Sequence, residues 1–204
     1  LDYQSIVSCI DGSLQRLQTD YVDLYMIHWP KPGMQPAEIM RALNAVVKSG
    51  KARFVGACNY PAWLLCYSNA LAAANGWAQL VCNQIPYNPI ERGGEVEVLP
   101  QAMAEGMAIT VYRALLMGLL AGKYIPGQPI PGDSRGTTDG RIVSWMERFS
   151  SGMQAMFDLA QARRVSPSHI AIAWLRSCPA VTCPIIGSSR LEQLEDNIRA
   201  FDCS

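Results

Sequence analysis

The stretch Tyr21-Val-Asp-Leu-Tyr-Met-Ile-His-Trp-Pro30 carries the clearest signal of the fold. It is rich in β-branched and aromatic residues and is stopped by a proline, a pattern that predicts a buried parallel strand ending at His28. Where strands and helices alternate, ligand-binding groups gather at the carboxyl ends of the strands, so His28 is the first candidate functional residue. Taken alone, His28 could equally be a core histidine hydrogen-bonded to backbone.

Composition narrows the class of protein. The 204 residues suit one large domain or two small ones, half of them are apolar, and 17 basic residues balance 17 acidic ones. With no run of Lys or Arg, there is no electrostatic case for binding nucleic acid or an anionic membrane. The sequence contains no apolar run of membrane-spanning length, no signal-peptide pattern at its start and no Cys-x-x-Cys among its seven cysteines. We therefore expect a cytoplasmic protein in a reducing compartment.

Predicted strands and helices alternate along the chain, which indicates a parallel sheet with helical crossovers. Glycine and proline dominate residues 125–139, which we expect to form a mobile loop over a site. Five strands are predicted, one ending at residue 28 and the others at 52–59, 79–84, 107–112 and 181–186. Helices are predicted at residues 6–17, 36–47, 61–76, 95–105, 166–177 and 191–201, with Ser166 as a cap and Pro167 in the first turn of the fifth.

Polar residues follow every predicted strand, and no Gly-x-Gly-x-x-Gly motif follows any of them. A missing dinucleotide fingerprint disfavours the open doubly wound sheet. Ligand-binding groups contributed by many successive strands favour a barrel mouth, although polar strand ends are also common for structural reasons. The strand-end residues are His28, Asn59, Gln84, Tyr112 with Arg113, and Ser188 with Ser189.

Five blocks in order resemble one known family, the aldo-keto reductases, and in particular the branch with the potassium-channel β subunits and similar bacterial reductases. The resemblance covers nearly all 204 residues, and five ordered blocks are far more specific than one. The blocks are Ser13-Leu-Gln-Arg-Leu-Gln-Thr-Asp-Tyr-Val-Asp-Leu-Tyr-Met-Ile-His28, Gly50-Lys-Ala-Arg-Phe-Val-Gly-Ala-Cys-Asn59, Asn83-Gln-Ile-Pro-Tyr-Asn88, Gly118-Leu-Leu-Ala-Gly-Lys-Tyr124 and Ile185-Ile-Gly-Ser-Ser-Arg-Leu-Glu-Gln-Leu-Glu-Asp-Asn197.

This resemblance implies an α/β fold, the (β/α)8 TIM barrel of aldo-keto reductase type, of which the chain supplies strands 4–8 and their helices. Residues 1–204 would be a single domain, the C-terminal part of the barrel, without the first three βα units and the C-terminal tail. Five strands cannot close an eight-stranded barrel, so we expect the sequence to be part of a longer protein. A second chain completing the barrel and a decayed relative are the alternatives.

The resemblance also implies reduction of aldehyde or ketone carbonyls to alcohols with NADP(H), which Ser189 and Arg190 favour over NAD(H). His28 would hydrogen-bond the substrate carbonyl and Trp29 would wall the substrate pocket. The aspartate, tyrosine and lysine of the family's catalytic set belong to strands and loops upstream of the first block. We therefore expect no meaningful turnover from these 204 residues alone.

The family's cofactor residues map onto fifteen positions. Asn59 and Gln84 would grip the nicotinamide carboxamide, with Cys58 in place of the usual serine, and Tyr112 would stack on the ring. Asn59 and Gln84 could instead satisfy buried loop backbone, and Tyr112 could be part of the core. Lys123 and Arg135 could be solvated loop charges, and Asp196 could only support its helix. The pyrophosphate would lie near Arg113, Ala114, Leu115, Leu116, Lys123 and Arg135, a phosphate near Gly187 and Ser189, and adenosine near Gln193, Asp196 and Asn197.

A second function from a different class is also implied. Potassium-channel β subunits are similar proteins, so the chain could belong to a nucleotide-binding regulatory subunit with little or no turnover. An apolar contact face on the outer helices would favour that hypothesis. A homo-oligomer is compatible with either function, and no metal is expected.

Overall fold

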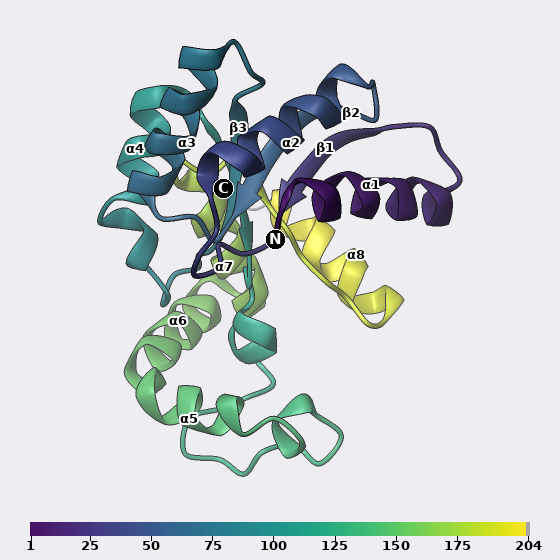
Figure 1. Ribbon diagram of the computed structural model, residues 1–204. Helices are drawn as coiled ribbons and strands as arrows, with labels where there is room; N and C mark the ends of the chain where they lie inside the picture. Colours follow the sequence, from purple (N-terminus) through teal and green to yellow (C-terminus); the bar gives the residue numbers. More distant parts are fainter. Residues whose placement is uncertain (203–204) are drawn as a thin grey trace. The chain divides into compact units, whose positions relative to one another are not determined.

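The computed structural model describes residues 1–202 (Figure 1). Its five strands form one parallel sheet in the order β1-β2-β3-β4-β5. The predicted alternation of strand and helix is confirmed, and the sheet is consistent with part of a (β/α)8 barrel. The strands are β1 Val22–Ile27, β2 Ala52–Cys58, β3 Leu80–Pro86, β4 Ala108–Tyr112 and β5 Cys183–Pro184. The helices are α1 Tyr3–Leu17, α2 Pro36–Lys48, α3 Ala62–Asn75, α4 Val98–Glu105, α5 Gly140–Arg148, α6 Ser150–Arg163, α7 Pro167–Ser177 and α8 Leu191–Arg199.

The chain divides into two compact units. Unit 1 comprises Leu1–Ile85 and Glu95–Ile109, and unit 2 comprises Pro86–Gly94 and Thr110–Ser204, of which residues up to 202 are described.

Unit 1 contains β1, β2, β3 as far as Ile85, and the helices α1 to α4. Asp2 caps α1, because its carboxylate accepts a hydrogen bond from the Ser5 backbone N–H at 2.8 Å. Apolar residues at helical spacing on α1 and α2 are buried, and the two helices pack against each other. The buried side chains of these helices include Ile6, Ile10, Leu14, Ile39, Met40, Leu43 and Val46.

Unit 2 has a second apolar core built on α5, α6 and α7. The fully buried Tyr124 belongs to this core, and its hydroxyl oxygen accepts a hydrogen bond from the Gly136 N–H at 3.0 Å. Segment 125–139, predicted as a mobile loop, is therefore attached to the core through Gly136, and Ile130 also packs against the core. The core comprises Leu116, Leu119, Leu120, Tyr124, Ile142, Met146, Met153, Met156 and Ala171.

Several sequence predictions need correction. The helices α5 and α6 were not predicted, although Asp139 caps α5 and Ile142 and Met146 are buried one turn apart on it. The helix predicted at 95–105 begins only at Val98, after a short 3-10 turn. Ser166 precedes α7 with extended backbone, but its side chain makes no capping hydrogen bond and bonds to other side chains instead. The strand predicted at 181–186 is shortened to Cys183–Pro184, and the Ile185 N–H adds one hydrogen bond to the Val111 carbonyl oxygen of β4.

Within residues 1–202, no helix is long and apolar enough to cross a membrane, and no group of three or more His, Cys, Asp or Glu could hold a metal ion. Six of the seven cysteines are free thiols, and the seventh, Cys203, lies outside the described residues.

Candidate active site

The carboxyl ends of β2 and β3 are brought into register by an irregularity at Gly56. The register runs Val55 with Leu80 but Ala57 with Asn83, so β3 contributes one extra residue at this point. A Cβ on Gly56 would lie 2.9 Å from the Cys82 carbonyl oxygen, which explains why only glycine fits here. As a result Gln84 pairs with Cys58, and both side chains face the same side of the sheet.

Cys58, Asn59 and Gln84 form one hydrogen-bonded group at these strand ends. The Asn59 Nδ2 donates to Cys58 Sγ at 3.1 Å and to the His28 carbonyl oxygen at 3.2 Å, and the Cys58 thiol donates to Gln84 Oε1 at 3.6 Å. Burial, with the neighbouring Cys82 thiol as a second cause, raises the pKa of Cys58 to about 11. Cys58 therefore stays protonated at neutral pH, in the form that can donate a hydrogen bond.

The backbone at Asn59 is left-handed, with φ of 61°, and Asn83 holds the residue that follows. The Asn83 side chain is fully buried; its Nδ2 donates to the Tyr60 carbonyl oxygen at 3.0 Å and its Oδ1 accepts from the Tyr60 N–H at 3.4 Å. The Asn59 N–H donates to the Gln84 carbonyl oxygen at 2.8 Å. The turn after β2 is thus fixed to β3 on both sides of Asn59.

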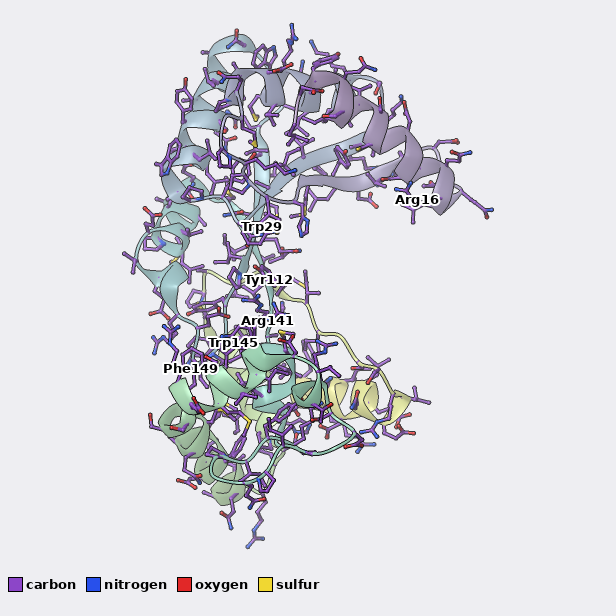
Figure 2. All side chains as sticks on the ribbon, turned by 60° about the horizontal axis from the view of Figure 1, so that its bottom comes forward. Arg16, Trp29, Tyr112, Arg141, Trp145 and Phe149 are labelled. Carbon is purple, nitrogen blue, oxygen red and sulfur yellow. The ribbon has the colours of Figure 1, made fainter. Side chains whose placement is uncertain are left out.

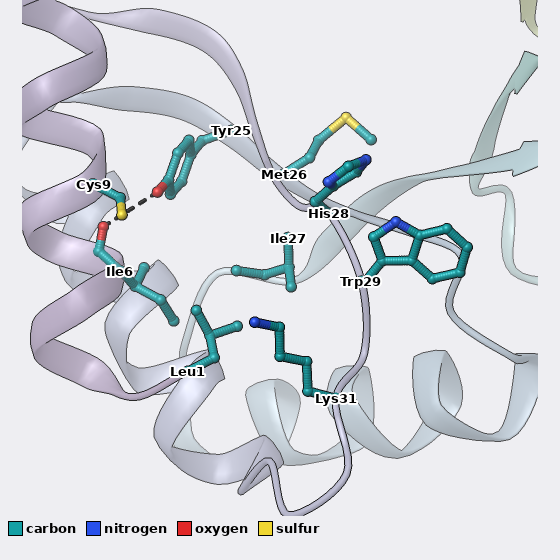
Figure 3. Close-up of a pocket in the computed structure, with 9 residues that line it drawn as sticks. All are labelled: Leu1, Ile6, Cys9, Tyr25, Met26, Ile27, His28, Trp29 and Lys31. Atoms are coloured by element: carbon teal, nitrogen blue, oxygen red, sulfur yellow. Dashed lines mark hydrogen bonds between the residues drawn. The ribbon is translucent and has the colours of Figure 1, made fainter. Parts of the chain in front are cut away.

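His28 and Trp29 line a pocket of about 270 Å³ beside β1 (Figure 3). Their rings approach edge to face, with centroids 6.1 Å apart. Tyr25 is turned toward α1, where its hydroxyl donates to the Ile6 carbonyl oxygen at 3.2 Å. The histidine is therefore at the exposed end of its strand, as predicted, and is not the buried core histidine of the alternative interpretation.

In unit 2, Arg113 follows β4 and lies against two aromatic rings. Its guanidinium carbon is 5.6 Å from the Tyr112 ring centroid and 5.1 Å from that of Trp145, both labelled in Figure 2, and its Nη1 is 3.4 Å from a Glu91 carboxylate oxygen. Its φ is 57°, in the left-handed region that a long side chain rarely adopts. Arg113 is thus held beside the predicted stacking residue, Tyr112.

Asn88 stabilises this conformation. The fully buried Asn88 donates from Nδ2 to the Arg113 carbonyl oxygen at 3.1 Å, while its Oδ1 accepts from the backbone N–H groups of Ile90 and Glu91. The same side chain therefore holds the Arg113 backbone and shapes the turn that presents Glu91. Asn83 and Asn88 are the first and last residues of the family block 83–88, and no role for either was predicted from the sequence.

The remaining predicted pyrophosphate residues differ in exposure. Ala114 and Leu116 are buried, Leu116 is part of the unit 2 core, and its N–H donates to the Arg113 carbonyl oxygen at 2.7 Å. Leu115 is partly buried against the same core. Lys123 and Arg135 are exposed, and Lys123 Nζ lies 5.0 Å from the Tyr124 ring centroid.

Arg135 also has a nearby carboxylate. Hydrogen bonds from the Arg141 side chain hold the pKa of Asp139 at about 2, and the charge of Arg135 contributes to lowering it.

The turn before α8 is closed by side chains of the helix itself. The Ser189 N–H and hydroxyl both donate to Gln193 Oε1, at 3.0 and 3.1 Å, and Asn197 Nδ2 donates to the Ser188 hydroxyl at 3.1 Å. Gly187 is exposed in this turn. Of the predicted phosphate and adenosine residues, Ser189 and Gln193 are thus hydrogen-bonded to each other, and Asn197 is bonded to the neighbouring Ser188.

Asp196 faces α7. Its Oδ2 accepts from the Ser166 and Ser168 hydroxyls, each at 3.1 Å, and His169 Nε2 lies 2.8 Å from its carbonyl oxygen and 3.1 Å from Oδ1. The carboxylate of Asp196 is the common partner of both serine hydroxyls and of the imidazole, whereas in a Ser-His-Asp nucleophile the histidine stands between the serine and the aspartate. This placement favours the alternative in which Asp196 supports its helix. His169 was not singled out from the sequence because its partner lies on a different helix.

Comparison with known proteins decides the family. The model of the aldo/keto reductase family matches residues 1–204. This chain belongs to the aldo/keto reductase family.

Three relatives illustrate the range of this family. "Uncharacterized oxidoreductase YrpG" of Bacillus subtilis is 33% identical over 195 residues, covering 96% of this chain and 58% of the relative. "Versiconal hemiacetal acetate reductase" of Aspergillus parasiticus is 32% identical, covering 97% and 57%. "Putative voltage-gated potassium channel subunit beta" of Schizosaccharomyces pombe is 29% identical, covering 99% and 60%. The chain therefore spans somewhat more than half the length of these aldo/keto reductase relatives.

Proposed function

We propose that the protein is an NADP(H)-dependent oxidoreductase that reduces aldehyde or ketone carbonyls to alcohols. The observation that carries this proposal is the group formed by Cys58, Asn59 and Gln84 at adjacent strand ends. Its hydrogen bonds orient both amides. The Asn59 Nδ2 donates to Cys58 Sγ and to the His28 carbonyl oxygen, and Gln84 Oε1 accepts from the Cys58 thiol. Each of these side chains is an amide, with both a donor and an acceptor, and this is the chemistry that complements a primary carboxamide.

The residues of each unit, taken by itself, suit one part of the cofactor. In unit 1 the amide pair would hold the carboxamide and so fix which face of the nicotinamide is presented, while NADPH supplies the hydride. In unit 2 Arg113 would donate to a phosphate, and Tyr112 would pack against the nicotinamide ring. Names of relatives that contain "oxidoreductase" and "reductase" support the same activity.

His28 would act on the substrate. Its imidazole lines the pocket beside β1 together with Trp29 and apolar side chains, so a carbonyl compound with an apolar substituent fits this site best. A hydrogen bond from the imidazole would orient the carbonyl oxygen and polarise it as negative charge develops there. Proton donation to that oxygen is not assigned to any residue of this chain.

The test is carbonyl-dependent oxidation of NADPH by the natural protein, followed by absorbance with a panel of aldehydes and ketones. The variant His28→Ala should lower kcat by about 100-fold, the usual cost of removing one hydrogen-bond donor to a developing oxyanion, with little change in NADP+ affinity. Tight binding of NADP+ without turnover of any carbonyl would contradict the reductase.

A regulatory subunit is the second candidate, favoured by the relative named as a channel β subunit and by exposed aromatic residues on an outer helix. Trp63 and Tyr67, one turn apart on α3, are 63% and 51% exposed. Turnover separates the two functions, because a regulatory subunit would bind NADP(H) without fast carbonyl reduction. In that case Trp63→Ala should weaken association with a partner while leaving NADP(H) affinity unchanged.

A further inference from the structure

Two predicted site residues have left-handed backbone directly after a strand, and each is held by a buried asparagine. Asn59 follows β2 with φ of 61°, and Arg113 follows β4 with φ of 57°. The two asparagines, Asn83 and Asn88, stand five positions apart in one segment of chain, and both are fully buried.

We propose that Asn83 and Asn88 are positioning residues, Asn83 for the amide of Asn59 and Asn88 for the guanidinium of Arg113. The ligands concerned are the carboxamide and the phosphates of the cofactor, so this inference rests on the proposed function for its binding test. Neither asparagine needs to touch the cofactor, since each acts through the backbone of another residue.

Asn83 acts on the turn that carries Asn59. Its two hydrogen bonds to Tyr60 occupy both backbone polar groups of that residue with one planar amide, which fixes where the chain goes after Asn59. A left-handed residue costs free energy and persists when its surroundings determine it. Loss of the Asn83 amide would leave a buried Tyr60 carbonyl unpaired and allow Asn59 to leave the left-handed region.

Asn88 acts on Arg113 in two ways. Its Nδ2 holds the Arg113 carbonyl, which favours the left-handed conformation, and its Oδ1 closes the turn that presents Glu91 to the guanidinium. The contact to the Arg113 carbonyl requires an N–H donor at position 88. The turn closed by Oδ1 requires only an acceptor there. The two contacts can therefore be separated by substitution.

The variants are Asn83→Ala, Asn88→Ala and Asn88→Asp in the natural protein. Asn88→Asp keeps the acceptor that closes the turn but removes the Nδ2 donor, which bonds to the Arg113 carbonyl oxygen and, at 3.4 Å, to Glu91 Oε2. Backbone chemical shifts that report φ give the first readout, which needs no cofactor. Asn83→Ala should move Asn59 out of the left-handed region and leave Arg113 in it, and both Asn88 variants should do the reverse.

The second readout is the affinity for two probes, NADP+ and 2′-phospho-ADP-ribose, which lacks the nicotinamide. Asn83→Ala should weaken NADP+ binding about tenfold, the value of about one hydrogen bond, and leave 2′-phospho-ADP-ribose binding within about twofold. Asn88→Asp should weaken both probes equally and make their binding less sensitive to salt, because one cation no longer meets the phosphates.

The outcomes are distinct. If the wild-type protein binds neither probe, the proposed function fails, and the chemical shifts alone judge the conformational part of this inference. If the probes bind but both asparagine variants weaken them alike, with equal loss of thermal stability and unchanged salt dependence, the asparagines are merely structural and the inference is overturned. Unchanged φ at Asn59 in Asn83→Ala would also overturn it.

Discussion

The strand ends of unit 1 and of unit 2 are built on the same backbone device but differ in chemistry. After β2, Asn59 is surrounded by neutral groups, an amide and a thiol, which bond to one another. After β4, Arg113 is surrounded by a carboxylate and two aromatic rings. A neutral group is recognised by orientation of donors and acceptors, whereas an anion is recognised by charge. Under the proposed function, the first unit would therefore recognise a carboxamide and the second a phosphate.

The two regions also differ in how rigidly they are packed. Substitution of Gly56 by alanine should show this difference with the largest effect. A Cβ at Gly56 would meet the Cys82 backbone at 2.9 Å, whereas a Cβ at Gly136 in unit 2 would meet only side chains, the nearest an Ile130 methyl at 2.8 Å. We expect Gly56→Ala to lower the free energy of unfolding by about 2–4 kcal/mol and Gly136→Ala by about half as much. Urea denaturation measures both, and an equal loss would contradict the difference in packing.

The reactivity of the Cys58 thiol, compared with that of a thiol in unit 2, shows how far the first unit excludes solvent. The pKa of Cys58 rises from 9.0 to about 11 through burial, so its thiolate fraction at pH 8 is roughly 100-fold below that of an ordinary thiol. Iodoacetamide should modify the exposed Cys183 of unit 2 long before Cys58, as measured by peptide mass spectrometry.

The raised pKa of Cys58 also predicts how the free energy of unfolding depends on pH. Since the pKa of Cys58 in the folded protein is above its ordinary value, its stabilising contribution is complete below about pH 9 and is lost as the pH rises through about 11. The variant Cys58→Ser should lack this alkaline loss. A wild-type unfolding free energy with the same alkaline profile as the serine variant would contradict the assignment.

Gln84 tests the amide pair directly. Gln84→Leu removes a donor and an acceptor at the end of β3 and should weaken NADP+ binding by about 10- to 100-fold, the cost of one or two hydrogen bonds. Gln154→Leu on the exposed surface of α6 is the control and should leave the affinity unchanged. Titration calorimetry measures both, and full retention of NADP+ affinity in Gln84→Leu would remove the amide pair from the site.

Asp196 tests whether a predicted adenosine residue of unit 2 is structural. Asp196→Ala removes the acceptor of two serine hydroxyls and the partner of His169, and should lower the free energy of unfolding by about 1–2 kcal/mol. The matched control Glu195→Ala, exposed on the same helix, should have little effect. Unchanged stability combined with a large loss of 2′-phospho-ADP-ribose affinity would show that Asp196 binds the cofactor instead.

Glu91 should give the smallest effect. Its ion pair with Arg113 is long and partly exposed, so Glu91→Gln should change the unfolding free energy by less than about 1 kcal/mol. Removing the competing carboxylate should raise the affinity for 2′-phospho-ADP-ribose by about two- to threefold at low salt, measured by fluorescence competition. A loss of affinity would indicate that Glu91 is needed to position Arg113.

The sequence was a good guide wherever short-range pattern decides structure. The apolar strand ending at His28 and the block ending at Asn59 predicted β1 and β2 to within a residue or two. The helices α5 and α6 were missed because the preceding glycine- and proline-rich stretch suggested a loop, although their methionines are spaced for burial. Lys123 and Arg135 were placed near phosphates by family resemblance, and that role remains a prediction.

Tertiary contacts account for what the sequence did not predict. The extra residue in β3 depends on the approach of the Cys82 carbonyl to Gly56, which no local pattern encodes. Likewise the partners of Asp196 come from another helix, and the roles of Asn83 and Asn88 depend on turns distant in sequence. Residue types identified the candidate groups, but only their spatial neighbours distinguish a ligand from a support.

The most direct test is NMR of the side-chain amide groups of Asn59 and Gln84 during titration of the natural protein with NADP+ and, separately, with 2′-phospho-ADP-ribose. We predict that both amide signals shift on saturation with NADP+ and stay near their free positions with 2′-phospho-ADP-ribose, because only NADP+ carries the carboxamide. Amide signals that remain unmoved at saturating NADP+ would contradict the assignment of this site.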